Sequence, residues 1–156
     1  MKRSLTRNLK SQAGMTLIEI MVVIAIIGSI AALATVKIMS SLEESRVETT
    51  KVQIQNIQTA LDNYRRKHGS YPTTEQGLQS LVEKPTVGKI PENYPEEGYM
   101  TTVPKDGWGN AFDFSSPGTN GHKVEIVSYG ADGAPGGEGN DADLMNYTIK
   151  EEGATP

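Results

Sequence analysis

The chain has 156 residues, enough for one small domain with appendages. It has no cysteine and only two histidines, so it can form no disulfide framework or thiolate metal site. The formal net charge is -4, but four of the 15 basic residues lie in residues 1–14, which contain no acid. The rest of the chain therefore carries 11 basic against 19 acidic side chains. An acidic body argues against nucleic acid as a partner, because phosphate binding needs a basic surface.

The basic residues 1–14 precede an apolar run from Met15 to about Val36. As a helix, a run of about 22 residues would extend roughly 33 Å, enough to cross a bilayer core. A basic leader before such a run is typical of a membrane-targeting element whose leader stays in the cytoplasm. The pattern predicts a single membrane span, with the rest of the chain outside the cytoplasm.

One carboxylate, that of Glu19, interrupts this run. A charge in a membrane segment costs roughly 2.5–3.5 kcal/mol on insertion scales, so we expect it to have a partner. Met15 lies four residues earlier, on the same helix face. Cleavage after Gly14 would give Met15 a free amine, with a reference pKa of about 7.7–8, and so create a counter-charge one turn from Glu19.

An ordinary secretory signal peptide is the competing interpretation of this region. Ala32-Leu33-Ala34 has the small-x-small pattern of a signal cleavage site, and cleavage there would release the protein. The acid within the apolar run, the length of that run and the lack of a turn-forming residue before Ala32 argue against it.

Helical character continues beyond the apolar run. Residues 37–67 contain no Gly or Pro, and four apolar residues follow the 3-4 spacing of one stripe: Ile54, Ile57, Leu61 and Tyr64. Gly69 and Pro72 are signals that end a helix. We therefore predict one helix from Met15 to about Lys67, roughly 80 Å long, apolar all round in its first half and amphipathic in its second, residues 37–68.

Residues 69–156 are predicted to form a small head. Thr73-Thr74-Glu75-Gln76 has the form of a capping box and predicts a short helix through about Val82. Residues 111–115 and 123–129 are predicted strands, joined by a turn over residues 116–121 that contains Asn-Gly. In the second strand, Val124 and Ile126 alternate with Glu125 and Val127. A third short strand is expected near Tyr147 to Ile149, and Trp108 is expected to plug the base of the sheet.

Residues 129–143 are rich in glycine and contain four acids, Asp132, Glu138, Asp141 and Asp143. Calcium binds 6–8 oxygens, typically from carboxylates and backbone carbonyls, and glycines let carbonyls turn inward. The spacing is not that of an EF-hand, and a solvated acidic turn is an equally good interpretation. A small head without disulfides would gain from a metal, and that consideration favours calcium.

Catalytic motifs are absent from the sequence. There is no phosphate-binding loop, no G-x-S-x-G elbow and no H-E-x-x-H, and no pair of acids is singled out for acid/base work. We therefore do not expect an enzyme.

Several motifs together resemble a known family. Gly14-Met15-Thr16-Leu17-Ile18-Glu19 resembles the leader junction of type IV pilin-like proteins. Tyr71-Pro72-Thr73-Thr74-Glu75-Gln76-Gly77-Leu78, Trp108-Gly109-Asn110, Ser116-Pro117-Gly118 and Tyr129-Gly130-Ala131-Asp132-Gly133 are similar to motifs of the major pseudopilins of the type II secretion system. The resemblance covers nearly the whole chain. It implies a pilin-like α+β fold, with a long amino-terminal helix packed on a small antiparallel sheet that carries a calcium loop.

The resemblance also implies a life cycle. A prepilin peptidase would remove residues 1–14 by cutting between Gly14 and Met15, and would methylate the new amine of Met15. Glu19 would pair with the amine of a neighbouring subunit as protomers leave the bacterial inner membrane. The product would be a helical periplasmic fibre that works with minor pseudopilins and an inner-membrane platform to export folded proteins.

The family's calcium site carries over by resemblance to the side chains of Asp132, Asp141 and Asp143 and to the carbonyls of Tyr129 and Asn140. Three positions depart from the family pattern. Met15 stands where phenylalanine is usual, Val36 where a helix-melting proline is usual, and Gly107 where a proline usually precedes the tryptophan.

Three other functions remain as alternatives. An adhesive or motility type IV pilin usually closes a carboxy-terminal loop with a disulfide, which cannot form here. An anchored periplasmic binding module has no need of Glu19 or of the Gly14 junction. A secreted hydrolase lacks a nucleophile and base.

Overall fold

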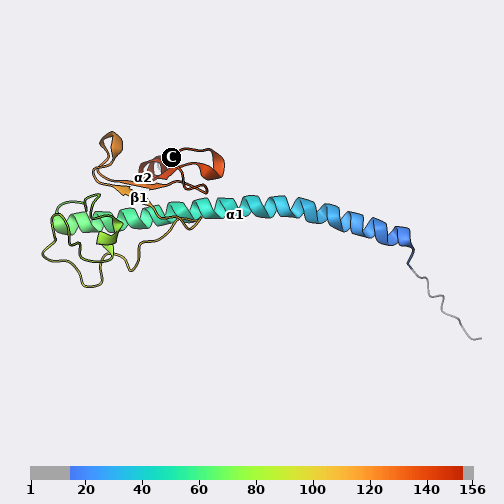
Figure 1. Ribbon diagram of the computed structural model, residues 1–156, viewed down its shortest axis with the longest axis horizontal. Coiled ribbons are helices and arrows are strands. Elements are labelled where there is room, and N and C mark those ends of the chain that lie inside the picture. Colours follow the sequence, from blue (N-terminus) through green and yellow to red (C-terminus); the bar gives the residue numbers. More distant parts are fainter. Residues whose placement is uncertain (1–14, 153–156) are drawn as a thin grey trace, which may run out of the picture. The chain divides into compact units, whose positions relative to one another are not determined.

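The computed structural model describes residues 15–152 of the chain. Helix α1 runs from Leu17 to His68 (Figure 1). The predicted single helix from Met15 to about Lys67 is therefore confirmed to within two residues at either end. The contacts divide the chain into two units, one ending at Ser40 and one beginning at Ser41, and each is described by itself.

The first unit is the apolar part of α1. Because of this part, α1 is long and apolar enough to cross a membrane, judged by length and composition alone. It is the one such helix among the described residues. Where the structure describes them, the side chains of the first unit's large apolar residues are exposed, from 39% at Ile20 to 82% at Leu17. The unit therefore has no apolar core of its own among the residues that the structure describes.

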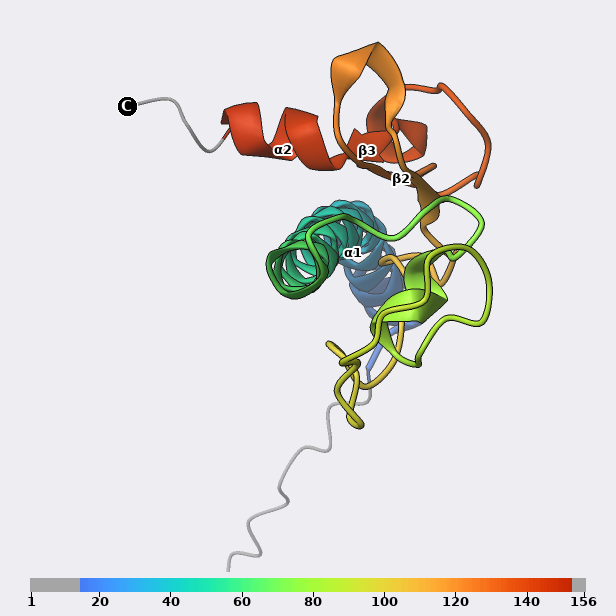
Figure 2. The same ribbon diagram turned by 90° about the vertical axis from the view of Figure 1, so that its left-hand side faces the viewer.

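The second unit is built on the amphipathic part of α1. The predicted stripe is confirmed, because Ile54, Ile57, Leu61 and Tyr64 are at most 2% exposed. They form a core with residues that lie in the sheet, directly before its strands, or in residues 78–81, namely Leu78, Leu81, Phe112, Phe114, Val124 and Ile126. Figure 2 looks along α1 and shows the sheet and α2 on one side of the helix and the green and yellow segment that follows the helix on another.

α1 ends at the residues predicted to end it. The backbone N–H of Gly69 donates to the Arg65 carbonyl at 2.7 Å, and Gly69 has a φ of 80°, the left-handed conformation in which glycine ends many helices. Pro72 follows and is buried.

The predicted capping box forms, but the helix that it should start does not. Thr73 N–H donates to Gln76 Oε1 at 3.0 Å, and Gln76 N–H donates to Thr73 Oγ1 at 3.3 Å. The prediction of a helix from here through Val82 is wrong, because the chain makes one turn and then a 3₁₀ helix, Leu78–Leu81. The break lies at Gly77, whose φ of 62° and ψ of -176° cannot continue a helix.

The sheet has three antiparallel strands in the order β1-β2-β3. They are β1 Asp113–Ser115, β2 Glu125–Ser128 and β3 Leu144–Met145. The predicted hairpin of the first two is confirmed with shorter strands, and Phe114 pairs with Ile126. Its connection contains a short 3₁₀ helix, Thr119–Gly121.

Two predictions for this sheet are wrong. The third strand lies at Leu144–Met145, and the expected position, Tyr147 to Ile149, is in helix α2, Asn146–Glu152. The expected alternation in the second strand is absent, because every residue of β2 is buried. Glu125 is only 8% exposed, and its carboxylate accepts a hydrogen bond from the Thr119 N–H at 2.8 Å. That bond compensates for burying the charge.

Candidate functional site

The amino end of α1 carries the predicted processing and assembly residues. Gly14 and the leader, residues 1–14, lie outside the described residues, and Met15 is 69% exposed. Thr16 caps the helix, because Glu19 N–H donates to its carbonyl at 3.1 Å and to its Oγ1 at 3.3 Å. Sequence reasoning missed this cap, although Thr16-x-x-Glu19 is the capping-box pattern.

Glu19 therefore lies in the first turn of α1, with its side chain exposed. The N–H groups of that turn give this end of the helix a partial positive charge, which favours a carboxylate. Met15 precedes the helix, which begins at Leu17, so the expected placement of Met15 and Glu19 on one helix face is not seen, and their pairing stays a prediction.

The Gly-rich loop, residues 129–143, is folded closely on itself. Ala131 N–H donates to the Asn140 carbonyl at 2.9 Å, and a short 3₁₀ helix, Gly139–Asp141, follows Glu138. A Cβ on Gly130 would lie 2.7 Å from the Asn140 carbonyl oxygen, and one on Gly137 would lie 2.5 Å from that of Asp141. Only glycine fits at these two positions without a backbone shift.

The carboxylates of this loop lie in different environments. Asp143 Oδ2 accepts a hydrogen bond from Gly136 N–H at 3.0 Å, whereas Asp143 Oδ1 is buried and has no hydrogen-bond partner. Asp132 Oδ1 accepts from Ala134 N–H at 3.0 Å in a tight turn. A buried carboxylate oxygen without a donor is unfavourable unless a cation or a water molecule meets it.

Tyr129 begins the loop beside acids. Its hydroxyl donates to Asp113 Oδ2 at 2.9 Å. This hydrogen bond, then burial, then the charges of Asp113 and Asp143, raises the pKa of the Tyr129 phenol. The start of the loop therefore lies among acidic side chains.

The predicted calcium ligands are brought together only in part. Hydrogen bonds tie Asn140 and Asp143 into the folded loop, and Asp141 lies in its 3₁₀ helix. Asp132 is engaged in its own turn. Across residues 15–152, no three acidic or histidine side chains lie close enough together to hold a metal ion. The three aspartates thus form no carboxylate triad in this structure, and the calcium assignment stays a prediction.

A clasp, residues 106–110, joins this loop to α1, and sequence reasoning missed most of it. Gly107 N–H donates to Thr50 Oγ1 at 2.9 Å, and a Cβ on Gly107 would lie 2.2 Å from the Arg46 carbonyl oxygen. The expected position of Trp108 is wrong: it is half-buried outside the core cluster, and its Nε1 donates to Glu43 Oε2 at 3.0 Å. The indole therefore holds α1 rather than the base of the sheet.

The buried carboxylate of Asp106 accepts the hydrogen bonds that hold the clasp in its fold. Asp106 is 6% exposed, and its Oδ1 accepts from the N–H groups of Trp108 and Asn110 while its Oδ2 accepts from Ser128 Oγ at 2.7 Å. Asn110 Nδ2 in turn donates to the Gly130 carbonyl at 3.1 Å. The clasp thus connects α1, β2 and the Gly-rich loop.

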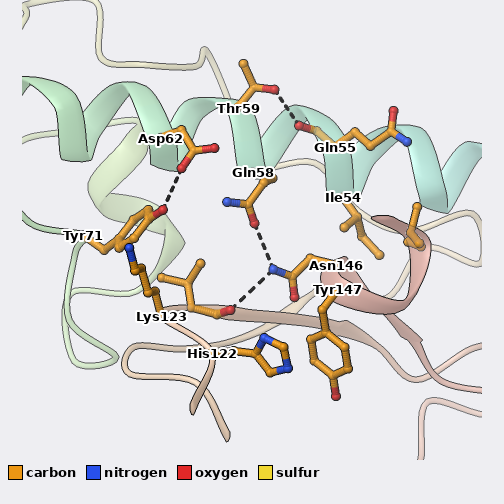
Figure 3. Close-up of a pocket in the computed structure, with 12 residues that line it drawn as sticks. Ile54, Gln55, Gln58, Thr59, Asp62, Tyr71, His122, Lys123, Asn146 and Tyr147 are labelled. Atoms are coloured by element: carbon orange, nitrogen blue, oxygen red, sulfur yellow. Dashed lines mark hydrogen bonds between the residues drawn. The ribbon is translucent and has the colours of Figure 1, made fainter. Parts of the chain in front are cut away.

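A hollow of about 580 Å³ lies between α1 and the start of α2 (Figure 3). Asn146 Nδ2 donates to Gln58 Oε1 on α1 at 2.9 Å, and Asn146 Oδ1 accepts from Ile126 N–H at 3.1 Å. At one corner the Tyr71 hydroxyl donates to Asp62 at 2.7 Å, and burial followed by this bond raises the pKa of Tyr71 to about 12. These groups join elements of the head, and their arrangement gives no activated nucleophile.

Comparison with known proteins places these features in a family. A family model described as type II secretion system (T2SS), protein G matches residues 37–147. A second model, described as the prokaryotic N-terminal methylation motif, matches residues 9–35. Both match where the motifs that carry the resemblance lie.

Individual relatives agree with these models. The type II secretion system core protein G of Pseudomonas aeruginosa is 44% identical over 138 residues, covering 88% of this chain and 96% of its own. That of Vibrio cholerae is 39% identical and covers 93% and 98% of the two chains. The crystal structure of the major pseudopilin from the type 2 secretion system of enterohaemorrhagic Escherichia coli matches with a TM-score of 0.62 at 37% identity. It covers 70% of this chain and 93% of that one.

The predicted pilin-like arrangement of a long helix and a small antiparallel sheet is thereby confirmed. The names of the relatives also favour the secretion system over an adhesive or motility pilus. The chain belongs to the protein G family of the type II secretion system, the family of the major pseudopilins.

Proposed function

We propose that this chain is the major structural subunit of a type II secretion pseudopilus, a periplasmic fibre that helps to export folded proteins across the outer membrane. The observation that carries the proposal is the relationship to core protein G, which extends over 88% of the chain at 44% identity. A structural role also fits the arrangement of side chains, because the polar groups of the clasp and of Asn146 join elements of the head.

The first unit supplies the membrane anchor in this proposal. Its exposed apolar side chains suit a bilayer before assembly and neighbouring helices after it. The basic leader, residues 1–14, would hold the amino end in the cytoplasm, so that the helix crosses the inner membrane once and the head lies in the periplasm.

Processing would occur at the amino end of α1. The match to the methylation motif over residues 9–35 supports a prepilin peptidase that cuts between Gly14 and Met15 and methylates the new amine. Glu19, exposed in the first turn, would then pair with the Met15 amine of a neighbouring protomer. In lipid such a pair supplies both attraction and register, because apolar burial alone does not favour one packing over another.

The other partners in this proposal are the minor pseudopilins and the inner-membrane platform of the secretion system. The printed names of the relatives support membership of that system.

Calcium is part of the proposal. The donors are those that calcium prefers, namely the carboxylates of Asp132, Asp141 and Asp143 and the carbonyls of Tyr129 and Asn140. The unpartnered Asp143 Oδ1 supports an ion at this position. When bound, the ion would neutralise the loop's acids and hold its ends together. Asp132 would exchange its hydrogen bond to Ala134 for the ion.

The experiment that tests the function compares Glu19→Gln with a matched control, Glu44→Gln, an exposed acid on the second half of α1. The full chain is expressed in cells that carry a prepilin peptidase and a secretion platform. Mass spectrometry of the amino terminus should find methylated Met15 in both variants, and fibres should form with the control alone.

Two results would contradict the proposal. Fibre formation by Glu19→Gln at the control's level would remove the pairing role. A purified chain that keeps residues 1–14, or one that begins at Thr35, would show that the chain is not processed as a pseudopilin.

A further inference from the structure

The second unit carries opposite charges at two levels along α1. The last turn of the helix bears Arg65, Arg66 and Lys67. The acidic Gly-rich loop lies at an earlier level, because the clasp binds it to α1 at Thr50. Thr50 and Lys67 are 17 positions apart on the helix, which corresponds to about 26 Å. Figure 1 shows the loop (orange to red) over a part of α1 well before its green carboxy-terminal end.

A cavity lies beside the basic carboxy-terminal end of α1. A cavity of about 300 Å³, the basic hollow, lies between the end of α1 and two stretches of the following segment. Four of its lining residues are exposed hydrogen-bond donors whose side chains are not engaged elsewhere: Lys67, Lys89, Ser70 and Asn93. All four are exposed, and none has a side-chain hydrogen bond or ion pair to another described residue. Glu92 is the one acid in this lining. The donors of the basic hollow are therefore free to bind an anionic group.

Glu138 is the acid of the Gly-rich loop that the proposed calcium site does not use. It is exposed, and its carboxylate has no partner within the described part of the chain. Gly137 and Gly139 flank it with φ values of 89° and 64°. Because neither neighbour has a side chain, the carboxylate of Glu138 stands unshielded at the surface of the loop.

We propose that Glu138 of one protomer enters the basic hollow of a second copy of this chain. This inference rests on the proposed homopolymer. No hydrogen bond or ion pair joins Glu138 to the basic hollow within the described chain, and the clasp holds the loop to α1 about 26 Å before Lys67. Complementary patches at different places on one chain make a heterologous contact, and repeated heterologous contacts generate an open helical filament. The pair supplies charge complementarity between heads, which favours the correct register of association.

Cysteine cross-linking tests the contact directly, because the chain has no cysteine of its own. The full chain carries Lys67→Cys together with Glu138→Cys and is assembled into fibres in cells with the secretion platform. We expect a ladder of disulfide-linked multimers on a non-reducing gel. Either single variant should give no ladder, since one cysteine per chain can join only two protomers. The matched control combines Lys123→Cys, an exposed lysine of the β1–β2 connection, with Glu138→Cys.

Exchanging the charges of the two partners tests whether the contact is electrostatic. Lys67→Glu with Lys89→Glu should lower fibre yield roughly tenfold, as should Glu138→Lys alone, because each brings like charges together. The combination of all three should restore the yield, whereas Lys123→Glu should leave it unchanged.

Fibres at normal yield with no ladder above the control pair would overturn the contact and leave the proposed function standing. The contact would also be overturned if the triple variant gave no higher fibre yield than the variants it combines and the ladder equalled that of the control pair. Failure of the unsubstituted chain to form fibres would overturn the proposed function and this inference with it.

Discussion

The two units of the chain place the same kind of side chain in opposite environments. Ile24, in the first unit, is 61% exposed, whereas Ile57, in the second, is fully buried, although both lie on α1. Burying such a side chain contributes roughly 1.5–3 kcal/mol. The second unit obtains this stabilisation within one chain. The first can obtain it only from lipid or from other chains, so the comparison separates the part with a core of its own from the part that needs other molecules to bury its apolar side chains.

The largest effect should come from breaking the clasp, which holds β2 and the Gly-rich loop on α1. Gly107→Pro removes the N–H that donates to Thr50 and brings ring atoms onto the Arg46 carbonyl. We expect a soluble form lacking residues 1–39 to lose about 3–5 kcal/mol of unfolding free energy, measured by urea denaturation. Lys105→Ala, an exposed neighbour, is the control. A loss below about 1 kcal/mol would contradict the role of the clasp.

Calcium should stabilise the second unit alone. At a hundredfold excess over its Kd, a bound ion adds about 2.7 kcal/mol. Chelation should therefore lower the Tm of the soluble form, and Asp143→Asn should abolish that response. Glu138→Gln should keep it, because Glu138 lies outside the proposed ligand set. A Tm that does not change on chelation would return the loop to the interpretation of a solvated acidic turn.

Asn146 joins the sheet to α1, and its loss should weaken the second unit to a smaller degree. Asn146→Ala leaves Ile126 N–H without its partner and removes the bond to Gln58. We expect a loss of about 2 kcal/mol, since a buried donor left unpaired costs about 1–3 kcal/mol. The control is Gln55→Ala, because the Gln55 side chain is exposed on α1. It should change stability by less than about 0.5 kcal/mol. Equal losses in the two variants would contradict the role of Asn146.

The smallest expected effect is a pH dependence at the end of α1. Burial, and then the neighbouring Lys67, lowers the pKa of His68, whose Nε2 lies 2.6 Å from the Tyr99 hydroxyl. Because the folded-state pKa lies below the unfolded value of about 6.5, the stabilisation is fully present above that pH. It is lost as the pH falls through the folded pKa. The Tm of the soluble form should therefore decline slightly below about pH 6.5. His68→Gln should remove the decline, and an unchanged decline in that variant would assign it to another group.

Local signals predicted much of the fold. The bounds of α1 followed from the unbroken run of helix formers and from Gly69 and Pro72. The hydrogen bonds of the capping box at Thr73 and Gln76 were also readable, because they join residues three apart. The motifs at the amino end and in the head were enough to indicate the family, and the family models match over the same stretches.

Most of the wrong predictions share one cause, which is a contact that no local pattern specifies. The strand expected at Tyr147 is a helix, because the Asn146 side chain bonds to β2 and Ile149 packs in the core. Glu125 is buried because the Thr119 N–H, in the preceding connection, meets it. Trp108 bonds to Glu43, 65 positions away, and no sequence pattern announces such a pair.

The carboxamide of Asn146 has a further consequence for the edge of the sheet. Strands with a free edge can recruit strands of other molecules and so begin amyloid-like aggregation. The N–H of Ile126, on β2, and the carbonyl of Val124, which directly precedes β2, face this side chain at 3.1 Å and 3.4 Å, just beyond the pairing with β3. A single amide thus occupies these backbone groups at the point where the ladder would otherwise continue, so they are not left open to pair with another strand.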